Sequence, residues 1–233
     1  MKSILLLHGW NYENYTSMTE STDAWDNRKK FVDELEKHFK VYKLNFPGFC
    51  GEPEPDKPWY LRDYASYVFN YLKKNNIQVD YILGYSFGGA VATLYGALLD
   101  PNQKIILISP AIARNNVKPK DVASIPKFIQ PIRNGLIDFY LKKIVKNPYM
   151  IHGTKFLNQS YQNIVRIELI KELNRINPEL LTIIYGAHDE MVNPPYVIKN
   201  LDKEHQDRVH LITSGGHDIA NTNTDEIISI ISK

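Results

Sequence analysis

Near the middle of the 233-residue chain, residues 81–95 read Tyr-Ile-Leu-Gly-Tyr-Ser-Phe-Gly-Gly-Ala-Val-Ala-Thr-Leu-Tyr. A short apolar run is followed by a glycine-rich turn around Ser86 and then by a helical pattern that begins at Ala90. A serine hydroxyl is a poor nucleophile, so an enzyme must expose it on a tight turn, beside a base and near donors for an oxyanion. The G-x-S-x-G pattern between a strand and a helix predicts such a nucleophile elbow. The alternative is a glycine-rich turn with an incidental serine.

Apolar runs of strand length recur along the chain, with amphipathic helical patterns between them. The runs are nearly continuous in hydrophobicity, which is expected for parallel strands covered on both faces. Their alternation with helices predicts an α/β sheet with right-handed crossovers. The strand candidates are Ile4–Leu7, Val41–Asn45, Tyr81–Gly84, Ile105–Ser109, Leu181–Tyr185 and Val209–Thr213, and the helix candidates are Asp26–Phe39, Leu61–Lys74 and Asp225–Ile231.

One interval is much longer than the others. A crossover between parallel strands needs only about a dozen residues, whereas the chain between Ser109 and Leu181 carries three helical patterns, at Lys120–Gln130, Ile132–Lys146 and Gln159–Asn174. We therefore predict that residues 1–110 and 181–233 form the core and that residues 111–180 form an inserted helical cap. The apolar residues of the cap mostly serve its own packing, and their number also favours an apolar acyl pocket.

Composition narrows the class of protein. The 28 Lys and Arg against 26 Asp and Glu give a net charge of +2, which argues against strong nucleic-acid binding. A single cysteine excludes an intrachain disulfide and a thiolate metal cluster. No apolar run approaches the roughly 20 residues that span a bilayer, and the first run is too short for a secretory signal, so we expect a cytoplasmic protein with no membrane span. Because metal-binding and dinucleotide motifs are also missing, we expect no metal and no cofactor.

Together with three further segments, the elbow sequence resembles the α/β-hydrolase superfamily over essentially the whole chain. The resemblance implies that Ser86 is the nucleophile, Asp189 the acid and His217 the general base. It also implies that the backbone N–H groups of Trp10 and Phe87 form the oxyanion hole. The three segments are His8-Gly9-Trp10, Tyr185-Gly186-Ala187-His188-Asp189-Glu190-Met191-Val192 and Gly215-Gly216-His217-Asp218.

The chain departs from the superfamily pattern in two places. Its oxyanion loop begins at residue 8, so the superfamily's first two strands are missing and we expect a reduced sheet of six parallel strands. The segment Asn45-Phe46-Pro47-Gly48-Phe49 resembles the superfamily's D-x-P-G-x-G loop, with Asn45 in place of the acid and Cys50-Gly51 in place of the second glycine. Neither change affects the predicted triad, and Cys50 is predicted to be structural.

Other side chains compete for the catalytic roles. Glu190 and Asp218 are rival carboxylates next to the predicted acid and base. His8 is expected to brace the oxyanion loop, His188 belongs to the acid loop, and His152 lies in the cap, where it could touch substrate. The remaining histidines, which have charged neighbours and are expected to be solvated, are His38, His205 and His210.

A serine nucleophile argues against the epoxide hydrolases and haloalkane dehalogenases of the superfamily, which use aspartate. We therefore predict a carboxylesterase-type serine hydrolase that cleaves a carboxylic ester of small to medium size through an acyl-enzyme on Ser86. The chain resembles small carboxylesterases such as the pimeloyl-acyl-carrier-protein methyl-ester esterases in its His-Gly-Trp and Pro-Gly-Phe segments and in the position of the cap. Two alternatives are a C–C bond hydrolase of vinylogous diketones and a ligand-binding receptor on the same fold.

The small net charge is a cancellation of two unlike parts. Residues 111–180 contain twelve Lys and Arg against five Asp and Glu, a net charge of +7, while the rest of the chain carries −5. Such asymmetry can steer an anionic substrate or an acidic carrier toward a pocket. The alternative is a solvated surface on a lysine-rich protein. The sequence leaves the oligomeric state open.

Overall fold

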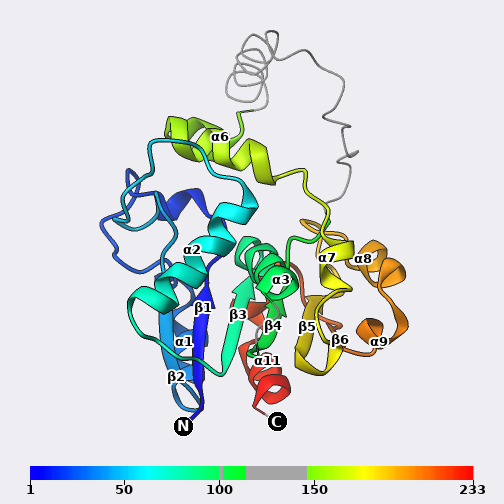
Figure 1. Ribbon diagram of the computed structural model, residues 1–233. Helices are drawn as coiled ribbons and strands as arrows, with labels where there is room; N and C mark the ends of the chain where they lie inside the picture. Colours follow the sequence, from blue (N-terminus) through cyan, green and yellow to red (C-terminus); the bar gives the residue numbers. More distant parts are fainter. Residues whose placement is uncertain (100–101, 114–145, 233) are drawn as a thin grey trace.

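A computed structural model of the protein describes residues 1–99, 102–113 and 146–232 (Figure 1). Within these residues the sheet has six parallel strands in the order β2-β1-β3-β4-β5-β6. The predicted reduced, all-parallel sheet is therefore confirmed, and every strand begins and ends within one residue of its prediction. The strands are β1 (Ser3–Leu7), β2 (Lys40–Leu44), β3 (Tyr81–Tyr85), β4 (Lys104–Ile108), β5 (Leu181–Gly186) and β6 (Val209–Ile212).

The strands are apolar throughout because both faces of the sheet are covered. Successive side chains of a strand point to opposite faces. In β1, Leu5 and Leu7 join one buried cluster, while Ile4 and Leu6 join the other. All four side chains are fully buried, which explains the continuous hydrophobic runs in the sequence.

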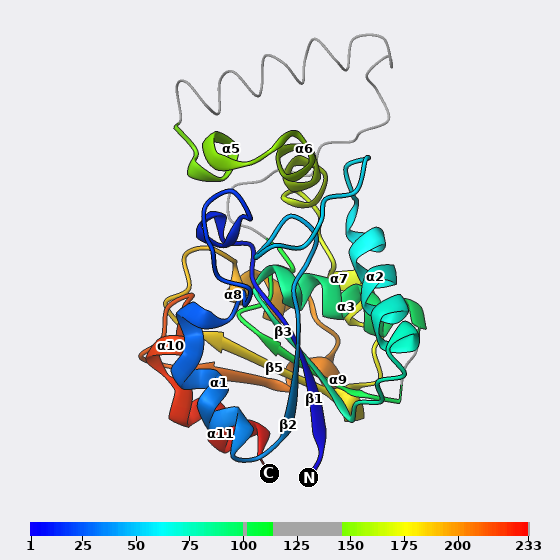
Figure 2. The same cartoon turned by 90° about the vertical axis from the view of Figure 1, so that its left-hand side faces the viewer.

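The helices lie in two layers, one on each side of the sheet (Figure 2). One layer holds α2 and α3, which pack against each other, together with α7 and α8; the other holds α1, α10 and α11. No described helix is both long and apolar enough to cross a membrane. The helices are α1 (Lys29–Glu36), α2 (Leu61–Lys74), α3 (Phe87–Leu99), α5 (Pro148–His152), α6 (Lys155–Ile164), α7 (Ile170–Leu173), α8 (Pro194–Asn200), α9 (Lys203–Gln206), α10 (Ile219–Thr222) and α11 (Thr224–Ile231).

Helices α5 and α6 lie beyond the carboxyl ends of the strands (Figure 2). The helix predicted at Lys120–Gln130 and nearly all of that at Ile132–Lys146 fall outside the described residues. The single helix predicted at Gln159–Asn174 is wrong, because α6 ends at Ile164 and α7 starts at Ile170. Between them the backbone turns toward the core, where the N–H of Leu169 donates to the carbonyl of Ile112 at 3.0 Å. This long-range bond replaces a helical one, a tertiary effect that periodicity cannot reveal.

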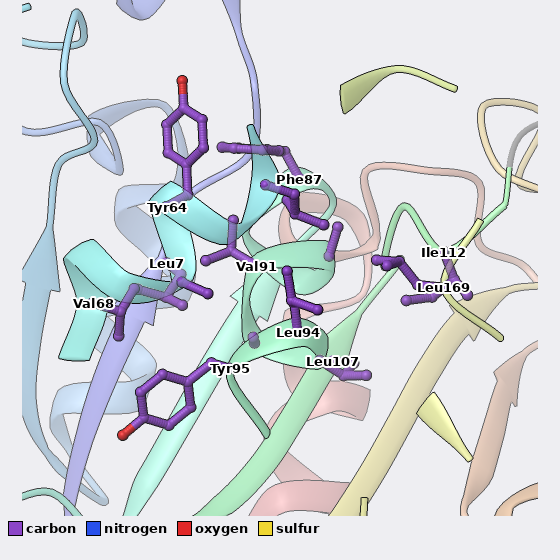
Figure 3. Packing of buried hydrophobic residues seen from close by; sticks show 14 of the residues in the cluster. Leu7, Tyr64, Val68, Phe87, Val91, Leu94, Tyr95, Leu107, Ile112 and Leu169 are labelled. Carbon is purple, nitrogen blue, oxygen red and sulfur yellow. The ribbon is translucent and has the colours of Figure 1, made fainter. Parts of the chain in front are cut away.

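Helix α2 has the boundaries that its apolar periodicity predicted. It begins at Leu61, and its first turn is capped because the Asp63 carboxylate accepts a hydrogen bond from the N–H of Tyr60 at 2.8 Å. Its buried face includes Val68, which belongs to the same apolar cluster as Leu7 of β1 and Val91 of α3 (Figure 3). The contact between α2, α3 and β1 therefore fixes the helix that follows Ser86.

We predict that Val68→Ala destabilises the protein while Ser66→Ala, two residues earlier, does not. Val68 is fully buried, so the truncation removes buried methyl groups and leaves a cavity, at a cost of about 2 kcal/mol. Ser66 is exposed on the opposite side of α2, and its replacement should change the free energy of unfolding by less than about 0.5 kcal/mol. Urea denaturation of both variants measures this difference. Equal midpoints would contradict the described packing of α2.

Candidate active site

Ser86 lies on a strained turn between β3 and α3. Its φ of +50° lies in the left-handed region, which is unusual for a residue other than glycine. Its neighbours have no room for a side chain: a Cβ at Gly84 would lie 2.3 Å from the carbonyl oxygen of Gly88, and one at Gly88 would lie 2.0 Å from that of Leu7. The Ser86 N–H donates to Ile108 at 2.9 Å. The sequence therefore forms the predicted elbow because only glycine permits α3 to approach the sheet so closely.

The structure brings Ser86, His217 and Asp189 into one hydrogen-bonded chain. The His217 Nε2 lies 3.0 Å from the Ser86 Oγ, and the His217 Nδ1 lies 2.8 Å from the Asp189 Oδ2. The three residues follow β3, β6 and β5, whose carboxyl ends meet at one edge of the sheet. With Nδ1–H donating to the carboxylate, Nε2 is free to accept the serine proton.

The Asp189 carboxylate is held on both oxygens. Its side chain is completely shielded from solvent, and its Oδ1 accepts hydrogen bonds from the N–H groups of Met191 and Val192 at 2.9 and 3.1 Å. Its Oδ2 is thereby left for His217. The position of the Asp189 carboxylate is therefore fixed by main-chain donors, and from it Asp189 can orient the imidazole.

The glycine at position 186 permits the acid loop and the histidine loop to touch. A Cβ at Gly186, the last residue of β5, would lie 2.1 Å from the carbonyl oxygen of Gly216. The His188 N–H donates to the carbonyl of Gly215 at 2.9 Å. The backbone of each loop thus fixes the other, and the separation of Asp189 and His217 follows from main-chain contacts.

The predicted oxyanion donors lie side by side. The rings of Trp10 and Phe87 are 5.0 Å apart in an edge-to-face contact, and neither backbone N–H donates to another described residue. The indole N–H of Trp10 donates to the Tyr15 hydroxyl at 2.6 Å, and that hydroxyl donates to the carbonyl of Tyr149 in α5 at 3.3 Å. Sequence patterns gave no sign of Tyr15, which fixes the ring of Trp10.

His8 braces the oxyanion loop, as predicted. Its Nδ1–H donates to the Gly9 carbonyl at 2.8 Å, and its Nε2 accepts from the Phe46 N–H at 3.0 Å. Burial lowers the pKa of His8 from 6.5 to about 4, because a charged imidazole loses its hydration there. His8 is therefore neutral at pH 7 and acts as a fixed crosslink between the loops that follow β1 and β2.

Neither Asp218 nor Glu190 takes the place of Asp189 at the Nδ1 of His217. Asp218 pairs with Arg28 at 2.7 Å, and Glu190 is exposed. Of the other histidines, His152 is exposed and its ring stacks on that of Tyr12 at 5.4 Å. His38, His188 and His210 are also exposed.

The expectation that His205 is solvated is wrong. His205 is 4% exposed, and its Nε2–H donates to the carbonyl of Ile176 at 2.8 Å. The exposed Lys203 and Glu204 of the same short helix face solvent, so the charged neighbours that suggested exposure lie on the opposite side. A helix of one turn is too short for its pattern to show which side faces the core.

The loop after β2 is structural. Burial raises the pKa of the Cys50 thiol to about 11, so it stays protonated at neutral pH and is a poor nucleophile. Asn45, which stands where the superfamily has an acid, accepts from the Ala24 N–H at 3.1 Å and donates to the Thr22 carbonyl at 2.8 Å. The described residues contain no group of three His, Cys, Asp or Glu side chains that could hold a metal ion.

A small cavity of about 20 Å³ lies beside the two oxyanion residues. Its lining comes from the loop after β1, from α2 and α3, from Ala111 after β4, and from α6 and the chain between α6 and α7. From the sequence we expected an apolar pocket formed by cap residues, whereas residues of the core helices also line this cavity. Most of the basic residues of the predicted cap fall within 114–145, outside the described residues, so steering by charge stays a prediction. The lining is Trp10, Leu61, Phe87, Ala90, Ala111, Tyr161, Ile164, Val165, Ile167 and Leu169.

Comparison with known proteins agrees with the fold and with the family resemblance. A model of the alpha/beta hydrolase family matches residues 4–229, and the chain therefore belongs to this family. No curated protein matches the sequence.

Solved structures with the same fold include hydrolases of several kinds. The 2-hydroxy-6-oxo-6-phenylhexa-2,4-dienoate hydrolase from Rhodococcus sp. strain RHA1 is 17% identical, with a TM-score of 0.63 over 99% of this chain and 89% of that one. The meta-cleavage product hydrolase from Pseudomonas fluorescens IP01 is 17% identical, with a TM-score of 0.65 over 100% and 89%. The monoacylglycerol lipase from Paleococcus ferrophilus is 17% identical, with a TM-score of 0.61 over 98% and 93%.

We predict that His8 makes the stability of the protein depend on pH. In the unfolded chain His8 takes up a proton near its ordinary pKa of 6.5, whereas in the folded protein it does so only near 4. Stability is therefore fully present above pH 6.5 and is lost as the pH falls toward 4, by about 3 kcal/mol. The variant His8→Gln lacks this contribution, so its free energy of unfolding should fall less over the same range.

Urea denaturation at several pH values between 7 and 4 measures the effect. The control is His38→Gln, which replaces an exposed histidine and should keep the pH dependence of the original protein. Parallel curves for the original protein and His8→Gln would show that buried His8 does not have the lowered pKa.

Proposed function

We propose that the protein is a serine hydrolase of the carboxylesterase type, which cleaves a carboxylic ester of small to medium size. The observation that carries the proposal is the hydrogen-bonded chain from Ser86 through His217 to Asp189, built on a strained elbow. A serine in a left-handed conformation costs free energy of about 1–3 kcal/mol. A chain that only bound ligands would have no use for that strain or for a buried acid aligned with a histidine.

Acylation begins with attack of the Ser86 Oγ on the ester carbonyl carbon, while His217 Nε2 accepts the hydroxyl proton. The tetrahedral oxyanion accepts hydrogen bonds from the Trp10 and Phe87 amides, each worth about 3 kcal/mol in sites of this kind. His217 then gives its proton to the leaving alcohol as the C–O bond breaks. Asp189 stabilises the transient imidazolium without taking its proton.

Deacylation repeats these steps with water as the nucleophile. His217 takes a proton from water, the hydroxide attacks the Ser86 ester, and the same amides hold the second oxyanion. The proton then returns to Ser86 as the carboxylic acid leaves, so no cofactor is consumed.

The acyl group of the substrate enters the cavity beside Trp10 and Phe87 in this proposal, and residues 111–180 act as the cap that covers it. The described lining residues of the cavity are mostly apolar, and none carries a charged side chain. An uncharged acyl chain suits that lining, whereas the dienoate named for the Rhodococcus enzyme is an anion and would need a partner for its charge. This contrast favours an ester over the C–C bond alternative.

We expect Ser86→Ala to reduce hydrolysis of p-nitrophenyl acetate and butyrate by at least about 10⁴-fold, because the acyl-enzyme can no longer form. Asp189→Asn and His217→Gln should each lower kcat strongly with little change in KM. The controls are Glu190→Gln and His188→Gln, which replace an exposed carboxylate and an exposed histidine on either side of Asp189 and should keep the activity. Steady-state kinetics on purified proteins measures all five.

Two further readouts separate the alternatives. A fluorophosphonate probe should add its mass to Ser86 in the folded protein, and failure to label would favour a binding protein. A panel of short esters and ring-fission diketones should show turnover of the esters. Preferential turnover of the diketones, lost in Ser86→Ala, would replace the ester assignment by the C–C bond alternative.

We also expect the small cavity to favour short acyl chains, so that acetate and butyrate esters exceed octanoate in kcat/KM. Ile164→Ala removes three carbon atoms from the lining and should admit a longer chain. Two extra buried methylene groups are worth about 1.6 kcal/mol, so the butyrate to acetate ratio of kcat/KM should rise about tenfold. The control is Ile151→Ala, at an exposed position of α5. Unchanged ratios in Ile164→Ala would place the acyl group elsewhere.

A further inference from the structure

The side chains of Arg28, Tyr85 and Asp218, which are far apart in the sequence, contact one another. Two of these residues are the immediate neighbours of Ser86 and His217 in the sequence. Tyr85 precedes Ser86, and Asp218 follows His217. Arg28 ends a short 3-10 turn, Asp26–Arg28, just before α1. These three residues, which we call the arginine cluster, lie behind the catalytic side chains and take no part in the steps above.

Arg28 contacts both other members of the cluster. Its Nη2 lies 2.7 Å from the Asp218 Oδ1 and 3.1 Å from the Tyr85 hydroxyl oxygen. Its guanidinium carbon lies 4.2 Å from the centre of the Tyr85 ring, a cation–π contact. The Arg28 side chain is 12% exposed and the Asp218 side chain is 46% exposed, so solvent screens the ion pair only from the Asp218 side.

Tyr85 and Asp218 complete the connection to His217. The Tyr85 hydroxyl donates to the Asp218 Oδ1 at 3.2 Å, with the His217 carbonyl oxygen at 3.4 Å as a second acceptor. The rings of Tyr85 and His217 are 5.7 Å apart. The other carboxylate oxygen of Asp218 accepts from Asn221 at 2.8 Å. The backbone of His217 is therefore held by Tyr85, directly at its carbonyl oxygen and also through the next residue, Asp218.

The charged and titratable groups around His217 come from several elements. Asp189 faces His217 from the loop after β5, and Tyr85 faces it from β3. Arg28 and Asp218 contribute one positive and one negative charge, which cancel while they are paired. Glu190 and His188 lie exposed on the acid loop, where solvent screens them.

We propose that Arg28 is a positioning residue for His217. Through Asp218 and Tyr85 it holds the histidine loop against the elbow, and its charge cancels that of Asp218, the residue that follows His217. An unpaired Asp218 would raise the pKa of His217, and an unpaired Arg28 would lower it. The proposal rests on the proposed function, since it assigns His217 the role of general base.

The test is a charge cycle of Arg28→Met, Asp218→Asn and the double variant. The acid limb of the pH profile of kcat/KM should move up by about half a unit or more in Arg28→Met and down by a similar amount in Asp218→Asn. It should return close to its original position in the double variant. Both single variants should also lower kcat more than they change KM. A purely structural role would produce no opposite shifts.

A second readout does not depend on turnover. In protein with ¹³C-labelled histidine and Ser86→Ala, nuclear magnetic resonance follows the titration of the His217 ring, assigned with His217→Gln. Opposite shifts in the two single variants support the proposal even if no ester is hydrolysed, in which case only the proposed function fails. Shifts in the same direction, or none, overturn the positioning role while esterase activity stands.

Lys29→Met is the matched control, because Lys29 is the next residue and its ion pair with Asp33 is exposed. It should leave both the pH profile and the His217 titration unchanged. If Arg28→Met does not fold, as judged by circular dichroism, Asp218→Asn alone decides: the pKa of His217 must fall, and an unchanged value overturns the proposal.

Discussion

The approach of α3 to the end of β1 is the constraint from which the rest of the site follows. The two elements are so close that a single carbon atom added at Gly88 would lie 2.0 Å from the Leu7 carbonyl oxygen. This contact forces the left-handed conformation of Ser86 and places Phe87 against Trp10. Backbone packing thus positions Ser86 and the two residues proposed to hold the oxyanion, Trp10 and Phe87. Catalytic groups held in this way lose little freedom when substrate binds, so little free energy is spent on ordering them.

Aromatic residues around Trp10 connect the loop after β1 to helices α5 and α6. The Tyr15 hydroxyl accepts from the Trp10 indole and donates to the Tyr149 carbonyl of α5. The Trp10 ring also lies 5.6 Å from that of Tyr161 in α6. Burial raises the pKa of Tyr15 well above its ordinary value, so its hydroxyl keeps its proton and remains a donor. A movement of α5 would therefore displace Tyr15 and, through it, the ring of Trp10, a residue proposed to hold the oxyanion.

Much of the fold could be predicted from the sequence, since two strong signals pointed the same way. Buried parallel strands leave continuous apolar runs, and the Ser86 turn sits between one such run and a helix. The three residues of the candidate triad were predicted from the elbow sequence and from the resemblance to the α/β-hydrolase superfamily, and the structure brings their side chains within hydrogen-bond distance of one another. What could not be predicted depends on contacts between distant segments. Arg28 meets Asp218 across 190 positions of sequence, His205 faces inward from a helix of one turn, and α6 ends where Leu169 bonds to another segment. No local pattern records such pairings.

That last bond has a consequence for the architecture of the chain. The N–H of Leu169 meets the carbonyl of Ile112 just where the chain leaves the end of β4, and the neighbouring Ala113 carbonyl accepts from the Asn193 N–H. These two hydrogen bonds hold the segment that follows β4 next to the segments that follow α6 and β5. A loop whose ends are fastened in this way can change its length at small entropic cost, since closure depends only weakly on loop length. Because these bonds join the described ends of the segment, a change in the number of residues between 113 and 169 would leave the hydrogen bonds among the six strands in place.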